Sequence, residues 1–135
     1  MHTSVRGIIE YEGKIILIHR KKQQEDGSIR DYYVVPGGKK EDGESDLDTV
    51  KREVLEEVGI IVEPKEIILE YNSKFNDSIQ KFYKCEYLKG IIGTGKGPEY
   101  TTDEYEGYIK AELIEKDKIG QINLVPKEIQ KILKI

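Results

Sequence analysis

The stretch that decides the fold is residues 38–60, which read GKKEDGESDLDTVKREVLEEVGI. Ser45 is a good helix N-cap, and Asp48 follows it three residues later, as in a capping box. Gly59 stands where helices commonly end in a left-handed residue. Between these two ends, apolar residues recur at helical spacing, at Leu47, Val50, Val54 and Val58. The stretch therefore predicts a helix over residues 45–58 that packs an apolar face on a sheet.

The same helix carries an acidic flank. At about 100° per residue, Glu53, Glu56 and Glu57 fall in one arc beside the apolar face. Carboxylates this close repel one another, and in a cleft a hard divalent cation relieves that repulsion. The alternative is an ordinary solvated face, which is what most glutamate-rich helices present. Arg52 adds only one positive charge, but its planar fork is suited to orienting a carboxylate.

The spacing of the whole stretch resembles the Nudix box, Gly-x5-Glu-x7-Arg-Glu-U-x-Glu-Glu-x-Gly-U, where U is aliphatic. Every specified position matches, from Gly38 through Glu44 and Arg52-Glu53 to Ile60. One departure lies outside the box, where Tyr33 replaces a Trp that often stands three residues before the Pro-Gly-Gly. The chain is accordingly identified as similar to Nudix hydrolases.

This resemblance implies a role for each residue of the box. Arg52 orients Glu53, and Glu44 supports the loop or a metal-bound water. The implied metal ligands are the carboxylates and one backbone carbonyl, from Glu53, Glu56, Glu57 and Gly38. The family's reaction is hydrolysis of a nucleoside diphosphate linked to another group, with Mg²⁺ or Mn²⁺. The chemistry agrees, because bound metals withdraw charge from a pyrophosphate and activate a water.

The rest of the chain contains more strand than helix. Strands are predicted over residues 5–11, 14–20, 31–35, 66–71, 79–88 and 107–114, and a final helix over residues 127–134. Residues 21–30, 72–78 and 89–106 are predicted as loops. These elements indicate a mixed α/β domain, and the resemblance implies an α/β/α sandwich with a mixed β-sheet. We expect residues 1–135 to form a single Nudix domain.

Composition excludes several classes of function. With 22 basic and 26 acidic residues, the net charge is −4, which argues against broad nucleic-acid binding. One cysteine cannot form an internal disulfide, and two histidines cannot form a histidine-rich metal site. No apolar run is long enough to span a membrane, and the first residues lack a signal-like core. We expect a cytoplasmic protein whose partner is a small nucleotide, with a homodimer left open.

The long segment 89–106 contains further candidates. Gly90 to Gly97 is a near-miss to a phosphate-binding Walker A loop, but Gly97 stands where a hydroxyl should be. Glu99 and Glu104 are candidates for a catalytic base outside the box. Lys96 and Tyr100 are candidate contacts to phosphate and base, the alternatives being a solvated lysine and a packing tyrosine.

Early strands and Cys85 provide the remaining candidates. Arg6, His19 and Arg20 are candidate phosphate contacts, the alternative being paired or solvated surface charges. Cys85 alternates with tyrosines and is predicted to pack as a small apolar residue. The leading interpretation is a metal-dependent nucleotide pyrophosphohydrolase. The alternative is a non-catalytic module that senses a nucleotide with the same fold.

Overall fold

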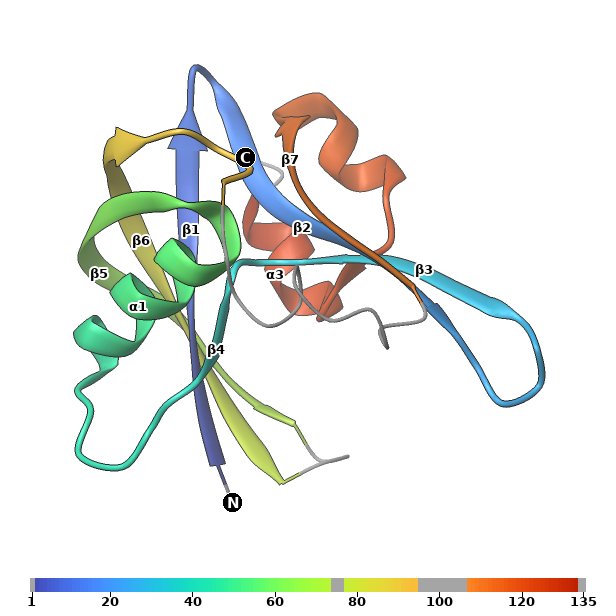
Figure 1. Cartoon of the computed structure of the whole chain (residues 1–135), viewed down its shortest axis with the longest axis horizontal. Coiled ribbons are helices and arrows are strands. Elements are labelled where there is room, and N and C mark those ends of the chain that lie inside the picture. The colour runs from blue at the N-terminus through green and yellow to red at the C-terminus, as the bar shows by residue number, and fades with distance from the viewer. Residues whose placement is uncertain (1, 74–76, 95–106, 134–135) are drawn as a thin grey trace.

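The structure is a computed structural model that describes residues 2–73, 77–94 and 107–133. The first half of the chain forms β1 (His2–Tyr11), β2 (Lys14–Gln23), β3 (Ile29–Val34), β4 (Gly37–Lys39) and α1 (Asp46–Val58). The second half forms β5 (Ile60–Ser73), β6 (Ser78–Gly90), β7 (Gly107–Glu115), the 3-10 helix η1 (Lys116–Gln121), β8 (Leu124–Val125) and α3 (Lys127–Leu133). Figure 1 shows their arrangement.

The strands form one mixed sheet in the order β5-β6-β1-β2-β3-β8, with β4 paired to β1 and β7 paired to β2. β1 is central, because it runs parallel to β6 and antiparallel to β2 and β4. β4 is short, and it places Gly37 and Gly38 opposite Arg6 and Val5 of β1. The sheet therefore brings the start of the Nudix-like stretch next to the first strand.

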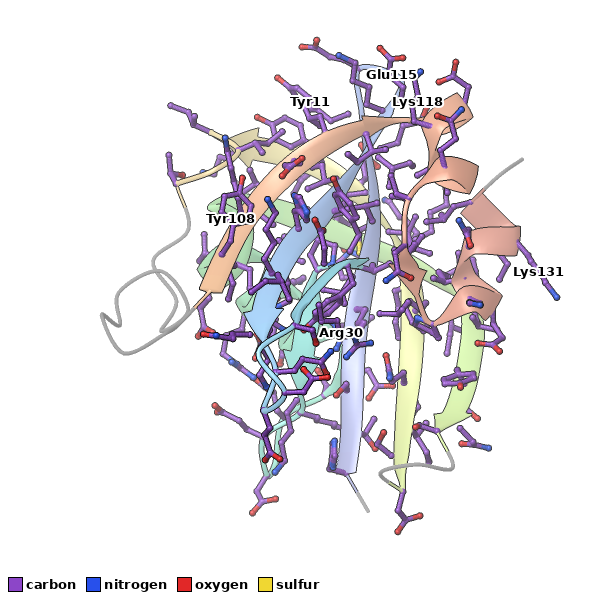
Figure 2. All side chains as sticks on the ribbon, turned by 90° about the vertical axis from the view of Figure 1, so that its right-hand side faces the viewer. Tyr11, Arg30, Tyr108, Glu115, Lys118 and Lys131 are labelled. Carbon is purple, nitrogen blue, oxygen red and sulfur yellow. The ribbon has the colours of Figure 1, made fainter. Side chains whose placement is uncertain are left out.

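Two hydrophobic cores lie on opposite faces of the sheet. One core packs Val50, Val54 and Val58 of α1 against alternate residues of β1 and β2. The other packs Ile129 and Leu133 of α3, with η1, against the intervening residues of those strands. Figures 1 and 2 show α1 on one side of β1 and α3 on the other. The predicted α/β/α sandwich with a mixed sheet is confirmed.

Both ends of α1 are built as the sequence predicts. The Ser45 side chain accepts a hydrogen bond from the Asp48 backbone N–H, which contributes about 1 kcal/mol at a typical N-cap. Gly59 is left-handed at φ 87°, and its N–H donates to the carbonyls of Leu55 and Val54. Full burial of each of the helix's three valines contributes about 1.5–3 kcal/mol. Local capping and tertiary packing thus specify the same helix.

The structure differs from the predicted elements in several places. Leu47 is 43% exposed, because the sheet covers the later turns of α1 and leaves the first turn uncovered. Strand pairing lengthens β2 and β3 into the predicted loop at residues 21–30. It also begins β5 at Ile60, six residues early, through pairing with β6. η1 and β8 were not predicted. No helix among the described residues is long and apolar enough to cross a membrane.

Candidate functional site

The site begins where β4 meets the C-terminal half of α1. The backbone N–H of Gly37 donates to Glu57 Oε1 at 2.8 Å, and Glu57 is buried. Gly37 has φ 150°, and a Cβ at this position would lie 2.3 Å from the carbonyl oxygen of Val5. Only glycine therefore allows β4 to approach both β1 and the buried carboxylate.

Gly38 makes a similar close approach to the next carboxylate. A Cβ on Gly38 would lie 2.5 Å from Glu53 Cδ, and within 2.8 Å of both carboxylate oxygens. The Glu53 side chain is only 14% exposed. The backbone at Gly38 thus forms a cradle for the Glu53 carboxylate. Because glycine has no side chain, β4 can lie against the acidic flank of α1.

Arg52 connects the other carboxylates. Its Nε and Nη2 donate to the two oxygens of Glu44 at 2.7 and 3.1 Å, in a bidentate pair. Its Nη1 donates to Glu53 Oε1 at 2.9 Å and lies 3.4 Å from both oxygens of Glu56. Hydrogen bonds from Arg52 lower the pKa of Glu44 to about 2, and those bonds in turn raise the pKa of Arg52. One guanidinium therefore orients three acids.

Glu44 also closes the loop before α1. It accepts hydrogen bonds from the backbone N–H of Glu41 at 3.1 Å and from the Thr49 hydroxyl at 2.8 Å. The Arg52 Nη2 donates to the carbonyl oxygen of Lys39 at 3.1 Å as well. These contacts tie the loop of residues 39–44 to the second turn of α1. Glu44 therefore holds this loop against α1, and its role in the reaction stays a prediction.

The acids are oriented, but they do not converge on one point. Among residues 2–73, 77–94 and 107–133, no group of three acidic, histidine or cysteine side chains forms a ready cluster for a metal ion. Glu57 faces the Gly37 N–H, whereas Glu53 and Glu56 face Arg52. The donor set is entirely oxygen, which fits a hard cation such as Mg²⁺ that shares its coordination with waters and substrate phosphate. The Gly38 cradle for Glu53 is consistent with this fit.

Two of the candidate arginines are not simple surface charges. Arg6 is partly buried, with Nε donating to Gln80 Oε1 at 3.0 Å and Nη1 donating to the carbonyl oxygen of Val35 at 2.8 Å. Burial lowers the pKa of Arg6, the charge of Glu57 opposes that shift, and the charge of Arg20 adds to it. The Nε of Arg20 is buried and finds no hydrogen-bond partner in the described part of the chain. Arg6 therefore lies close enough to Glu57 for the two charges to attract, and close enough to Arg20 for the two positive charges to repel.

His19 is instead paired with two carboxylates. Its Nδ1 lies 2.7 Å from Glu112 Oε2, and its Nε2 lies 2.6 Å from Asp31 Oδ1. Its ring stacks on Tyr33 with centroids 4.2 Å apart, and the Tyr108 ring meets it edge-on at 5.2 Å. His19 therefore links β2, β3 and β7, and Tyr108 has a packing role.

Some candidate residues lie outside the part of the chain that the structure describes, and two residues with clear contacts near α1 and Arg6 were not predicted. Glu99, Glu104, Lys96 and Tyr100 lie outside the described residues. Sequence reasoning did not find Asp46, which accepts from Lys40 Nζ, Lys81 Nζ and the Tyr83 hydroxyl at 3.0–3.1 Å. It also missed Gln80. Neither has a local signal, because their partners are 6 to 74 residues away in the sequence.

Comparisons with known proteins agree with this geometry. The sequence profile described as the NUDIX domain matches residues 1–127. A protein named ADP-ribose pyrophosphatase from Methanocaldococcus jannaschii is 34% identical over 91 residues. That match covers 67% of this chain and 52% of the relative, so the chain spans about half of the relative's length.

Two solved structures share the fold. A NUDIX hydrolase from Nitrosomonas europaea has a TM-score of 0.71 at 21% identity, covering 98% of this chain and 68% of that one. An ADP-ribose pyrophosphatase from Streptococcus suis has a TM-score of 0.68 at 23% identity, covering 98% of this chain and 88% of that one. With the profile matching nearly the whole chain and the box residues assembled around Arg52, the protein belongs to the Nudix family.

Proposed function

We propose that the protein hydrolyses a pyrophosphate bond in a nucleoside diphosphate linked to another group, and that it requires Mg²⁺ or Mn²⁺. The observation that carries this proposal is the placement of Glu53 and Glu57 of α1 against the backbone of Gly38 and Gly37. The names of the relatives, which refer to pyrophosphatases and NUDIX hydrolases, support the same reaction class.

In this proposal, the metal would be held by three carboxylates and one backbone carbonyl, from Glu53, Glu56, Glu57 and Gly38. A bound divalent cation would draw negative charge from the diphosphate and lower the pKa of an attacking water. Arg52 positions Glu53 and Glu56, and Glu44 fixes the guanidinium of Arg52 through its bidentate pair. The protein's own contribution is then orientation and a preorganised field, which account for most of what phosphoryl transfer needs.

We further propose Glu99 or Glu104 as the catalytic base, with Lys96 and Tyr100 as substrate contacts. These residues follow β6 in the chain and precede β7, whose pairing partner β2 carries Arg20. Glu99→Gln and Glu104→Gln test the assignment separately. Substitution of the true base should lower kcat. The affinity of that variant for Mn²⁺, measured by electron paramagnetic resonance, should be unchanged. If both variants keep the rate of the unmodified protein, the base lies elsewhere.

The reaction is tested with a panel of nucleoside triphosphates, dinucleoside polyphosphates and nucleoside diphosphate sugars, including ADP-ribose. Products are separated by chromatography, so that the cleaved bond is identified for each substrate. We expect turnover with added Mg²⁺ or Mn²⁺ and none in excess EDTA. Full activity in EDTA, with metal content verified, would show that the metal assignment is wrong. Tight nucleotide binding with no turnover of any substrate would instead support the nucleotide-sensing module.

A further inference from the structure

The first turn of α1 is held in place by a polar contact rather than by apolar packing. Leu47 in this turn is 43% exposed, and Val50 is the first apolar residue of the helix that is buried. Asp46, the first residue of α1, has a side chain that is only 17% exposed. Figure 1 shows this end of α1, where the loop from β4 joins the helix. The Asp46 carboxylate therefore takes the place that apolar side chains occupy in the later turns.

The two oxygens of the Asp46 carboxylate contact different parts of the fold. Oδ1 accepts a hydrogen bond at 3.0 Å from Nζ of Lys40, which lies in the loop of residues 39–44. Oδ2 accepts from Lys81 Nζ at 3.1 Å and from the Tyr83 hydroxyl at 3.0 Å, and both of these residues belong to β6. One carboxylate thus bridges the loop on one side and a strand of the sheet on the other.

This bridge depends on a full carboxylate. Burial raises the pKa of Asp46, but the hydrogen bonds from Lys40, Lys81 and Tyr83 outweigh burial and lower this pKa below its ordinary value. Both carboxylate oxygens accept, whereas an ammonium group can only donate. An asparagine could offer its one oxygen to Lys40 or to Lys81, but its N–H₂ would then face the other ammonium. Replacement of Asp46 by asparagine therefore removes one arm of the bridge completely.

The loop that the bridge holds carries the partners of Arg52. The carbonyl oxygen of Lys39 accepts from Arg52 Nη2 at 3.1 Å, and Glu44 forms the bidentate pair with the same guanidinium. Arg52 in turn donates to Glu53 at 2.9 Å. Lys40 follows Lys39 directly in the chain. A shift of Lys40 would therefore move the Lys39 carbonyl and, through Arg52, the carboxylate of Glu53.

We propose that Asp46 is a positioning residue, which fixes the loop of residues 39–44 and thereby the orientation of Glu53 and Glu56 on Arg52. Asp46 itself touches neither the metal nor the substrate in the proposed function. The inference rests on the proposed function for the metal that Glu53 and Glu56 would bind, whereas the anchoring of the loop is a property of the chain alone. Partners that orient metal ligands in this way are typically worth about 10- to 100-fold in metal affinity or activity.

Amide hydrogen exchange, followed by NMR in the intact chain, tests the anchoring without metal or substrate. The backbone N–H groups of Lys40, Glu41 and Glu44 all donate to acceptors in this loop or beside it. In Asp46→Asn these three amides should exchange about 10-fold faster, because the loop opens more often. Unchanged exchange at all three amides would overturn the inference.

Asp48→Asn is the matched control for the exchange measurement. Asp48 is the other acidic residue in the first turn of α1, and it is exposed. Its carboxylate has no hydrogen bond or ion pair with the residues that the structure describes, so its substitution changes the charge near the helix N-terminus without cutting a bridge. Exchange of the loop amides should be unchanged in this variant. The same acceleration in both variants would mean that helix charge, and not the bridge, holds the loop.

The affinity for Mn²⁺, measured by electron paramagnetic resonance, tests whether the anchoring reaches the acidic flank. Asp46→Asn should raise the Kd for Mn²⁺ by about 10-fold, and Asp48→Asn should leave it unchanged. For a substrate that the unmodified protein cleaves, kcat of Asp46→Asn should fall more than KM rises, because Asp46 contacts no substrate group. A lower melting temperature with unchanged Mn²⁺ affinity and kcat would show that Asp46 only stabilises the fold, and the inference would be wrong.

Lys40→Met cuts the loop arm of the bridge alone. It should weaken Mn²⁺ binding by itself, and adding Asp46→Asn to it should change the Kd by less than about 2-fold more, because both substitutions break the same link. Lys84→Met, at an exposed position of β6, removes a lysine charge elsewhere and should have no effect. If the effects of Lys40→Met and Asp46→Asn multiply in the double variant, Asp46 does not act through the loop and the inference is overturned.

The positioning role and the proposed function fail in different ways. If Asp46→Asn speeds exchange and weakens Mn²⁺ binding while the unmodified protein cleaves no substrate, the reaction is wrong and the positioning role stands. If the unmodified protein cleaves a substrate and Asp46→Asn matches it in exchange, Mn²⁺ affinity and kcat, the positioning role is wrong and the reaction stands. An unmodified protein that binds no Mn²⁺ would contradict both.

Discussion

The backbone of Gly38 lies directly against the carboxylate of Glu53, close enough that a Cβ on Gly38 would be 2.5 Å from Glu53 Cδ. The neighbouring Gly37 has a different constraint, because its Cβ would meet the backbone carbonyl of Val5 at 2.3 Å. A flexible side chain can move away from a new methyl group, whereas a paired strand cannot. Gly38, the first residue of the box, and Gly37, which precedes it, therefore serve different purposes.

Gly38→Ala should displace the Glu53 carboxylate while the fold survives. We expect kcat/KM to fall by about 10-fold or more, since a misplacement of about 1 Å in a catalytic group is costly. The melting temperature should change little. Gly37→Ala is the matched comparison and should unfold at a clearly lower temperature, because its clash is with backbone at φ 150°. Equal effects of the two substitutions on stability would contradict this division.

Glu44→Gln should change how stability depends on pH. The Glu44 pKa is lowered from 4.5 to about 2 in the folded protein, chiefly by hydrogen bonds from Arg52. A lowered folded-state pKa stabilises the protein above the unfolded value, and that stabilisation is lost as pH falls from about 4.5 toward 2. Urea unfolding at pH 7, 5, 4 and 3 measures the free energy of unfolding. That of the variant should be lower than that of the unmodified protein by a constant amount at first, and the difference should shrink at the lowest pH values. A difference that grows as the pH falls would contradict the lowered pKa of Glu44.

Conservative changes in the acidic flank should separate catalysis from folding. Glu53→Gln, Glu56→Gln and Glu57→Gln keep the side-chain shape, and each should lower kcat by about 10²-fold. Circular dichroism should show a folded protein in every case, because an amide oxygen can still accept the existing hydrogen bonds. Glu66→Gln, on an exposed position of β5, is the control and should retain full activity. Wild-type rates in all three variants would refute the catalytic assignment.

Arg20→Met should stabilise the protein in the absence of substrate. The buried Nε of Arg20 has no hydrogen-bond partner among the residues that the structure describes, and the positive charge of Arg6 is nearby. Removing an unsatisfied donor of this kind should raise the free energy of unfolding by about 1 kcal/mol. Guanidinium denaturation provides the measurement, with the exposed Lys22→Met as the control. A marked loss of stability would mean that Arg20 is paired.

Cys85 should be inert in the folded protein. It is 5% exposed, and burial together with the charge of Glu63 raises the pKa of its thiol to about 12. Because only the thiolate reacts, modification by a disulfide reagent at pH 8 should be at least about 100-fold slower than in denaturant. Rapid modification of the native protein would show that the residue is accessible and refute the packing role.

Much of the box was predictable because its signals are local. Ser45 caps α1 through a contact three residues away, and Gly59 ends the helix through bonds four and five residues back. Arg52 reaches Glu53 and Glu56 within one helical turn. Such contacts depend on the helical repeat alone, and the repeat can be read from residue types along the chain.

The strand ends and the support of α1 were less predictable, because they depend on partners far along the chain. β5 begins at Ile60 only because Gly90 of β6 pairs there. Asp46 is held by Lys81 from β6, 35 residues away. Leu47 satisfies the apolar spacing of the helix and is nevertheless exposed, because spacing predicts a face but not how far the sheet extends beneath it.

The sequence by itself determined the family, the capped helix and the order of acids around Arg52, because each depends on contacts within a few residues. Only the tertiary structure decided which of the early charges face the site. Arg6 and His19 are both basic residues on adjacent strands. Arg6 lines a cavity with Gln80 and Pro126, whereas His19 lies between Asp31 and Glu112. The reason is physical: a strand residue's surroundings come from its sheet partners, and β6, β4 and β7 bring those partners from distant parts of the chain.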